Sequence, residues 1–148
     1  MLTEEGWKWD KDKKELTLHD ALPKQVKISG VSATIINSGD SLIVTDTGMA
    51  LYTSGDRKEL NITGTGTLTL ENTAGSTDKV LSNEDTSGLL TISGDSLVVN
   101  CISDNSYEYA VGIYDGLKIT NGAQLNINSL KGYGTRIYTD GTLCVDKG

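Results

Sequence analysis

Tyrosines recur near the end of three of the four copies of a repeated segment, with Ser82 in the fourth, and they are the residues best suited to bind a ligand. Three follow directly after an aliphatic residue and three lie just upstream of such a segment; these are Tyr52, Tyr114 and Tyr138, and Tyr107, Tyr109 and Tyr133 respectively. Because strand side chains alternate between faces, the first three are predicted to form an outward ladder. Such rings suit the faces and hydroxyls of a glycan chain. Alternatively, they stack on one another for stability alone.

Aspartates occupy the turns after the same segments, at Asp56, Asp85, Asp115 and Asp140. Stacked carboxylates repel one another unless a cation or backbone donors satisfy them. Calcium, which prefers oxygen ligands, is therefore a candidate ligand of these turns. The alternative is that each carboxylate caps nearby backbone N–H groups. No other cofactor is expected.

A second acidic segment, Asp10-Lys11-Asp12-Lys13-Lys14, superficially resembles the start of a calcium-binding loop. Its adjacent lysines would repel a cation, and the glycine that such a loop needs at its sixth position is missing. We predict a charged hairpin turn here.

Catalytic arrangements are hard to build from this sequence. His19 is the sole histidine, so a Ser-His-Asp or Cys-His arrangement would have to use it, and it is expected to be solvated beside Asp20. A lyase needs clustered carboxylates beside a basic residue, but Arg57 and Arg136 fall in different copies of the repeat. No aspartate pair stands at adjacent outward positions, as a polysaccharide hydrolase would need. We predict that the protein is not an enzyme.

The element that must position these residues is a repeat of about five imperfect copies. Each copy opens with an apolar-x-apolar triplet, is followed by glycine and a second triplet, and closes with a third segment. Taking Ile36, Ile62, Ile92, Ile119 and Val145 as the anchors of successive first triplets, the steps are 26, 30, 27 and 26 residues. Two segments match especially well, Ser38-Gly39-Asp40-Ser41-Leu42 and Ser93-Gly94-Asp95-Ser96-Leu97.

Three short strands per copy predict a short, right-handed parallel β-helix of about five coils. Alternation places Leu60 and Ile62 inside and Asn61 outside. One coil cannot bury its own apolar face, whereas stacked coils build a continuous apolar ladder. An antiparallel β-sandwich also has short strands and glycine-rich turns, but it has no reason to repeat the same three segments.

The two ends of the repeat differ. We predict one domain over residues 1–148, in which residues 1–20 form an N-terminal capping hairpin or first coil and residues 21–148 form the stacked coils. Trp7 and Trp9 share one face at strand spacing and are expected to cover the core; the alternative is an exposed platform for sugars. The last coil shows no cap, so we expect either a longer natural protein or edge-to-edge association at the C-terminal coil.

These segments carry a family resemblance. Gly6-Trp7-Lys8-Trp9-Asp10, Glu15-Leu16-Thr17-Leu18 and the later Ile-Tyr-Asp-Gly units resemble repeats in secreted or cell-surface proteins of Gram-positive gut bacteria. Those proteins often carry the label of carbohydrate-binding domain and are regarded as right-handed β-helices. The resemblance implies that fold and an exported location. Some related proteins have Asp-Asp-Gly turns implicated in calcium binding, and this chain has none, which weakens the calcium inference.

Composition excludes several classes of partner. The 148 residues include 13 basic and 20 acidic side chains, so the net charge of −7 opposes binding to nucleic acid. No apolar run is long enough to insert into a membrane. Residues 1–3 lack the apolar core of a signal peptide, so an exported protein would carry its signal outside this chain. Cys101 and Cys144 show no metal-binding spacing and are expected to be unpaired thiols.

These observations favour a non-catalytic extracellular or cell-surface module that binds polysaccharide through the tyrosine ladder. A structural or adhesive spacer without a small ligand is the first alternative, and a polysaccharide lyase or hydrolase is the second.

Overall fold

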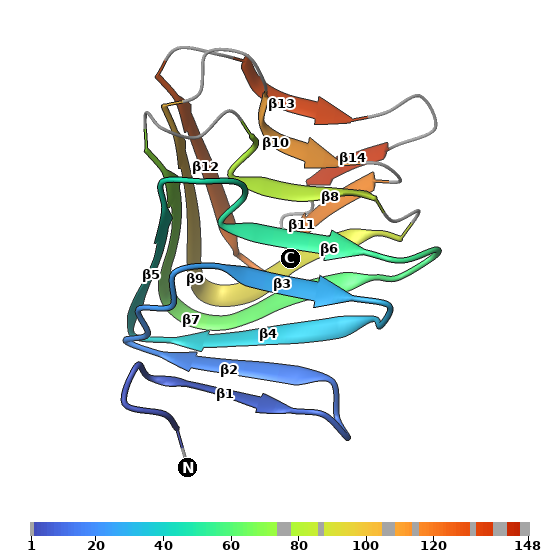
Figure 1. Ribbon diagram of the computed structural model, residues 1–148. Coiled ribbons are helices and arrows are strands. Elements are labelled where there is room, and N and C mark those ends of the chain that lie inside the picture. The colour runs from blue at the N-terminus through green and yellow to red at the C-terminus, as the bar shows by residue number, and fades with distance from the viewer. Residues whose placement is uncertain are drawn as a thin grey trace.

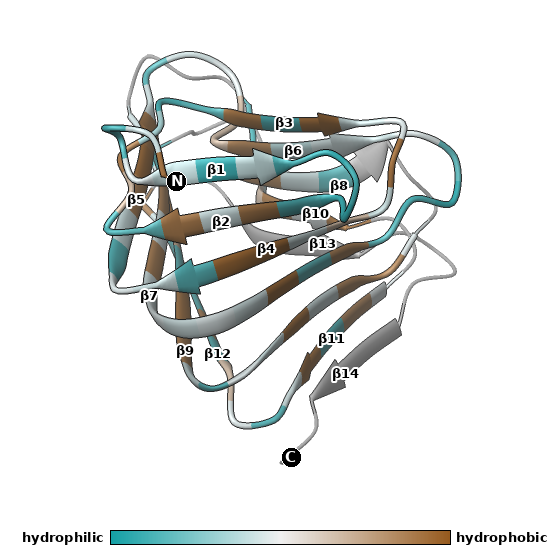
Figure 2. Cartoon of the chain, turned by 90° about the horizontal axis from the view of Figure 1, so that it is seen from below, coloured by the Kyte–Doolittle hydropathy of each residue, from teal (hydrophilic) through white to brown (hydrophobic). Residues whose placement is uncertain are grey.

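Fourteen β-strands and no helix form the described part of the chain. The computed structural model describes residues 2–73, 78–85, 88–104, 109–113, 116–130, 133–137 and 142–145, with the backbone alone for residues 84–85, 133–137 and 142–145. The strands wind as a β-solenoid with parallel sheets, which confirms the predicted fold class. Seen from the N-terminal end in Figure 2, the chain runs clockwise and recedes from the viewer, so the coil is right-handed.

Each level of the coil has three sides, visible in Figures 1 and 2. The first side stacks β2 (Glu15–His19), β4 (Ala33–Ser38), the first parts of β7 (Leu60–Asn72) and β9 (Leu90–Ser103), β11 (Gly116–Thr120) and β14 (Thr142–Val145). The second side stacks β5 (Asp40–Thr45), the later parts of β7 and β9, and β12 (Gln124–Ser129). The third side is a separate five-stranded sheet of β3 (Val26–Ser29), β6 (Leu51–Ser54), β8 (Leu81–Asp85), β10 (Tyr109–Ile113) and β13 (Tyr133–Ile137).

The first and second sides merge into one long strand at two levels, where the sequence predicts two short strands. β7 has 13 residues and β9 has 14, and both bend at glycines with positive φ, such as Gly64 at +112°. Glycine reaches these angles without a Cβ clash, so the chain turns the corner while its ladder continues. Asn37, buried at the same corner one level below, donates from Nδ2 to the Thr65 carbonyl at 2.8 Å and ties the two bends together.

The register corrects two alignments made from the sequence. Ile62 pairs with Ile35, so Ile35 is buried and Ile36 lies half-buried on the outer face. The first anchor was therefore wrong by one residue, because two adjacent isoleucines give no signal of which one faces inward. Likewise, Leu42 is 37% exposed whereas Leu97 is fully buried, so the two most similar segments of the sequence are not structurally equivalent.

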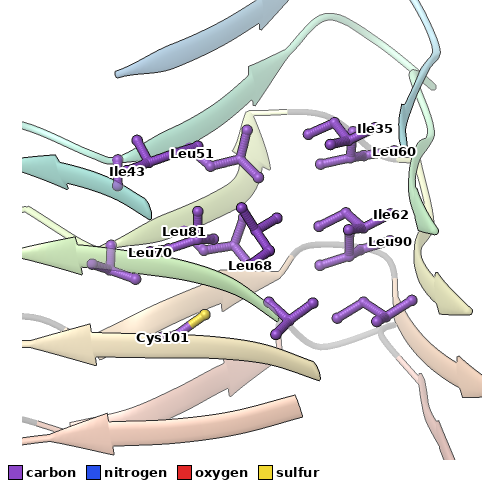
Figure 3. Close-up of a cluster of buried hydrophobic side chains, with 14 of the residues drawn as sticks. Ile35, Ile43, Leu51, Leu60, Ile62, Leu68, Leu70, Leu81, Leu90 and Cys101 are labelled. Atoms are coloured by element: carbon purple, nitrogen blue, oxygen red, sulfur yellow. The ribbon is translucent and has the colours of Figure 1, made fainter. Parts of the chain in front are cut away.

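Stacked aliphatic ladders fill the interior of the coil, as Figure 3 shows. One ladder runs through Ile35, Ile62 and Ile92, and a second through Leu60 and Leu90, all of them in register and fully buried. Burying each such side chain contributes about 1.5–3 kcal/mol. The core is therefore built level by level, as expected for a solenoid.

An antiparallel hairpin closes the N-terminal end. β1 (Trp7–Asp10) pairs with β2, placing Trp7 opposite Leu18 and Trp9 opposite Leu16. Viewed from that end, β1 lies between β2 and β3 (Figure 2). Trp7 packs against the core, which confirms its predicted capping role, whereas Trp9 is 37% exposed and covers less than was expected.

The hairpin turn is closed by Asp10, as the charged-turn interpretation predicts. Its Oδ1 accepts the backbone N–H groups of Asp12 at 3.0 Å and Lys13 at 3.1 Å. The hydrogen bond from Lys13 is the main cause that holds the pKa of this carboxyl below its usual value. The carboxylate oxygen thus binds backbone donors within its own turn.

Candidate functional site

Tyr52 is the one member of the predicted ladder whose side chain the structure describes. It lies half-buried on the outer side of β6, and the Lys27 ammonium sits 5.3 Å from its ring centroid. Tyr114 and Tyr138, its predicted partners in the ladder, lie outside the described residues, as does Tyr107.

The pairing within the third sheet shows which described residues share the row of Tyr52. The row that contains Tyr52 continues through Ser82 and Gly112 to Arg136. Beyond Tyr52 the pairing of β6 with β8 becomes irregular, because Tyr52 lies opposite Ser82 whereas Ser54 lies opposite Asp85.

Tyr109 and Tyr133 begin neighbouring strands instead of lying in the preceding loops. Tyr109 is the first residue of β10, and its register partner on β13 is Tyr133, of which the backbone is described. Tyr109 lies two and four residues before the buried Val111 and Ile113, so its side chain is on the same face of β10 as theirs. It therefore does not share the outward row of Tyr52.

The predicted calcium ligands are only partly described. Asp56 is exposed in the turn after β6, and Asp85 ends β8, where its backbone is in register with Ser54. Asp115 and Asp140 lie outside the described residues. Within the described residues, no three His, Cys, Asp or Glu side chains group closely enough to hold a metal ion. Calcium binding stays a prediction.

Four side chains on the outward faces of β3 and β6 form what we call the outer patch: Lys27, Ser29, Tyr52 and Ser54. Lys27 pairs in register with Tyr52, and Ser29 pairs with Ser54. The two serine hydroxyls lie 3.1 Å apart, with Ser54 donating to Ser29. The patch thus combines an aromatic ring, two hydroxyls and a cation on two adjacent, hydrogen-bonded strands.

His19 takes part in a Ser-His-Asp arrangement that the sequence analysis did not predict. Its Nδ1 lies 2.9 Å from Ser38 Oγ, and its Nε2 lies 3.5 Å from Asp20 Oδ2. Ser38 Oγ also lies 3.3 Å from the Leu18 carbonyl oxygen. Which of His19 Nδ1 and Ser38 Oγ donates in this pair is set by the tautomer of His19.

This exposed network has a structural role. The side chains of His19 and Asp20 are 56% and 63% exposed, as expected for solvated groups. Asp20 Oδ1 accepts the backbone N–H of Asp40 at 2.7 Å, and His19 is in register with Ser38. The network therefore ties the first level of the coil to the second.

A hollow of about 740 Å³ opens at the N-terminal end, between the β1–β2 hairpin and β3. We call it the N-terminal groove; its walls are Glu5, Trp7, Trp9, Leu16, Leu18, Pro23, Lys24, Gln25, Val26, Lys27, Ile28, Ser29 and Val31. The third sheet ends at β3, whereas β1 adds a further strand to the first side. The sequence singled out both tryptophans. It could not predict the groove, because the groove exists only where one sheet ends before the other, and a pattern of strands does not show where sheets end.

Cys101 is a free, fully buried thiol in the core, in register with Leu70 and Ile127. Burial raises the pKa of its thiol to about 12. The thiolate, not the thiol, is the reactive form of cysteine. Cys101 is therefore unreactive in the folded protein, and the side chain of Cys144 lies outside the described residues.

We expect the stability of the Cys144→Ser variant to fall as pH rises above about 9. The unfolded thiol then ionises while folded Cys101 keeps its proton, so the unfolded state is favoured progressively up to the folded pKa of about 12. Urea unfolding at pH 8 and 10.5 measures this, with Cys144→Ser/Cys101→Ala as the control that lacks the buried thiol. An equal loss of stability in both proteins would contradict the assignment, as would rapid labelling of native Cys101 by a thiol reagent at pH 8.

No family model, no curated protein and no solved structure matches this chain. Within the described residues, no helix has the length and apolar character needed to span a membrane.

Proposed function

We propose that this solenoid is a non-catalytic module of an exported or cell-surface protein, and that it binds polysaccharide through its third sheet. The observation that carries the proposal is the outer patch, where Tyr52 stands beside Lys27 and two serine hydroxyls. The resemblance to repeats of surface proteins supports the same location and ligand class.

The chemistry of the outer patch suits a sugar. A tyrosine has an apolar ring that contacts the C–H face of a pyranose and a hydroxyl that hydrogen-bonds at its edge. Ser29 and Ser54 offer hydroxyls that both donate and accept, as sugar hydroxyls do. Because all four residues of the patch stand on paired strands, little ordering is needed when a ligand binds.

A non-catalytic role agrees with the chemistry of the described side chains. The described Ser-His-Asp arrangement is exposed and ties two levels of the coil together through Asp20. The buried thiol is held in its unreactive form by its raised pKa. The described residues thus place no activated nucleophile beside the outer patch.

Replacing Tyr52 with alanine is expected to weaken polysaccharide binding by about tenfold, because a stacked ring contributes about 1–2 kcal/mol. A glycan array followed by titration of the best ligand measures the loss. Tyr52→Phe is the matched control, since it keeps the ring and removes only the hydroxyl. The double variant Tyr114→Ala/Tyr138→Ala tests the other predicted tyrosines. If no glycan binds, or if Tyr52→Ala and the double variant both bind like the wild type, the polysaccharide proposal fails.

A structural or adhesive spacer is the second candidate, and the continuous core favours it. Every level adds the same ladder contacts between paired strands, so the fold can extend a surface protein without any ligand. The spacer role predicts two results. The protein binds no glycan, and it keeps its stability when the four residues of the outer patch are replaced by alanine.

A further inference from the structure

We propose that the N-terminal groove and the free edge of β3 together bind an extended polypeptide strand, in which apolar residues alternate with acidic ones. This inference concerns a different ligand from the polysaccharide proposal, and its surface shares Lys27 and Ser29 with the outer patch. Four features carry it: the open edge of the third sheet, the apolar groove beside that edge, the position of Trp9, and the positive charge at the rim.

Among the described strands, β3 is the edge of the third sheet, and one row of its backbone groups faces outward. The N–H groups of Val26 and Gly30 donate to the carbonyls of Ala50 and Ser54, both at 2.8 Å, on the side of β6. In a parallel ladder, successive residues direct their N–H and C=O groups to opposite sides. The backbone groups of Lys27 and Ser29 therefore point away from β6, and β3 is the last strand of its sheet. An extended chain can pair with such an edge through its main chain.

The apolar groove requires the added strand to carry an apolar side chain at every second position. Val26 and Ile28 face the interior from β3, and Trp7, Trp9, Leu16 and Leu18 line the opposite wall. A strand paired with β3 directs every second side chain toward this apolar hollow. Burial of those side chains, together with the main-chain hydrogen bonds, favours a polypeptide over a sugar in this groove.

Charge selects acidic residues for the other positions of the strand. Lys24 and Lys27 are exposed at the rim of the groove. Glu5, the one acidic residue of the walls, has its Oε2 engaged by Trp7 Nε1 at 2.9 Å. A carboxylate directly across from Lys27 on the outer face makes a favourable cross-strand pair, whereas a lysine there is repelled.

The two tryptophans of the chain both line the groove and report on its occupancy. We expect a seven-residue peptide with valine at alternate positions, and glutamate or threonine between them, to cause a saturable change in tryptophan fluorescence. The same peptide with lysine in place of glutamate is expected to bind at least fivefold more weakly. A scrambled peptide with adjacent valines is expected to bind still more weakly.

Ser29→Pro is the decisive variant. It removes the outward N–H of residue 29 and leaves the bonds of Val26 and Gly30 to β6 in place, since proline is tolerated on the open side of an edge strand. We expect it to bind the acidic peptide at least tenfold more weakly than the wild type. Ser29→Ala is the matched control, because it loses the same hydroxyl but keeps the N–H, and it should bind like the wild type.

Trp9→Ala gives a second line of evidence if Ser29→Pro melts at a lower temperature than Ser29→Ala. Trp9 is 37% exposed, so its removal alters the groove more than the core, and Trp7 still reports binding. We expect a loss of at least fivefold. The proposal is overturned if the wild type binds none of the peptides, if folded Ser29→Pro and Trp9→Ala both bind like the wild type, or if the scrambled and lysine peptides bind as tightly as the acidic one.

Discussion

Replacing Gly64 with alanine is expected to destabilise the protein by about 3–5 kcal/mol, which is a large part of the stability of a domain of this size. Gly64 bends β7 at the corner between the first and second sides, with φ at +112°. A Cβ built there overlaps the carbonyl oxygen of Asn37 one level below and lies 2.9 Å from its backbone nitrogen. Both contacts are with backbone, so relief requires the two levels to separate.

Gly30→Ala is the matched control for this prediction. Gly30 also has a positive φ, +72°, but a Cβ there meets nothing within 4 Å. The Gly30→Ala variant should therefore lose only about 1–2 kcal/mol of stability, from the strain of a left-handed backbone conformation. Urea unfolding followed by circular dichroism compares the two variants. Equal losses would mean that backbone strain, and not the close stacking of levels, determines the effect at Gly64.

The sequence pattern was sufficient to predict the fold because the core depends on a period of two within each strand and on repetition between strands. Leu60 and Ile62 were assigned to the interior, and both are fully buried. Turn residues gave a less reliable guide. Ser, Gly and Asp favour bends wherever the chain turns, so two nearly identical turn segments can precede strands of different register.

The candidate site was less predictable because it depends on relations between levels. Beyond Tyr52, β8 has one more residue than β6 between paired positions, so equal spacing in the sequence no longer means equal position in the third sheet. The N-terminal groove depends on the third sheet ending at β3 while β1 extends the first side. Each feature is a difference in length between stacked elements, which a list of similar triplets does not contain.

Ile35→Ala is expected to destabilise the protein by about 2–5 kcal/mol, whereas Ile36→Ala should cost about 1 kcal/mol or less. Ile35 is fully buried between its register partners Leu16 and Ile62, so truncation leaves a cavity between two levels of the core. Ile36 is half-buried on the outer face, in register with Thr17 and Thr63. The two variants remove the same atoms from adjacent positions, so their difference measures the direction of the side chain alone.

This pair of variants tests the register of the second level directly. A slip of one residue exchanges every inward and outward side chain of a strand. The sequence-based anchor at Ile36 predicts the opposite order of the two losses. Chemical unfolding of both variants distinguishes the two registers, and a larger loss for Ile36→Ala would overturn the pairing of β4 with β2 and β7. Because each level packs only on its neighbours, the cavity at Ile35 should also weaken the contact of the N-terminal hairpin with the rest of the coil.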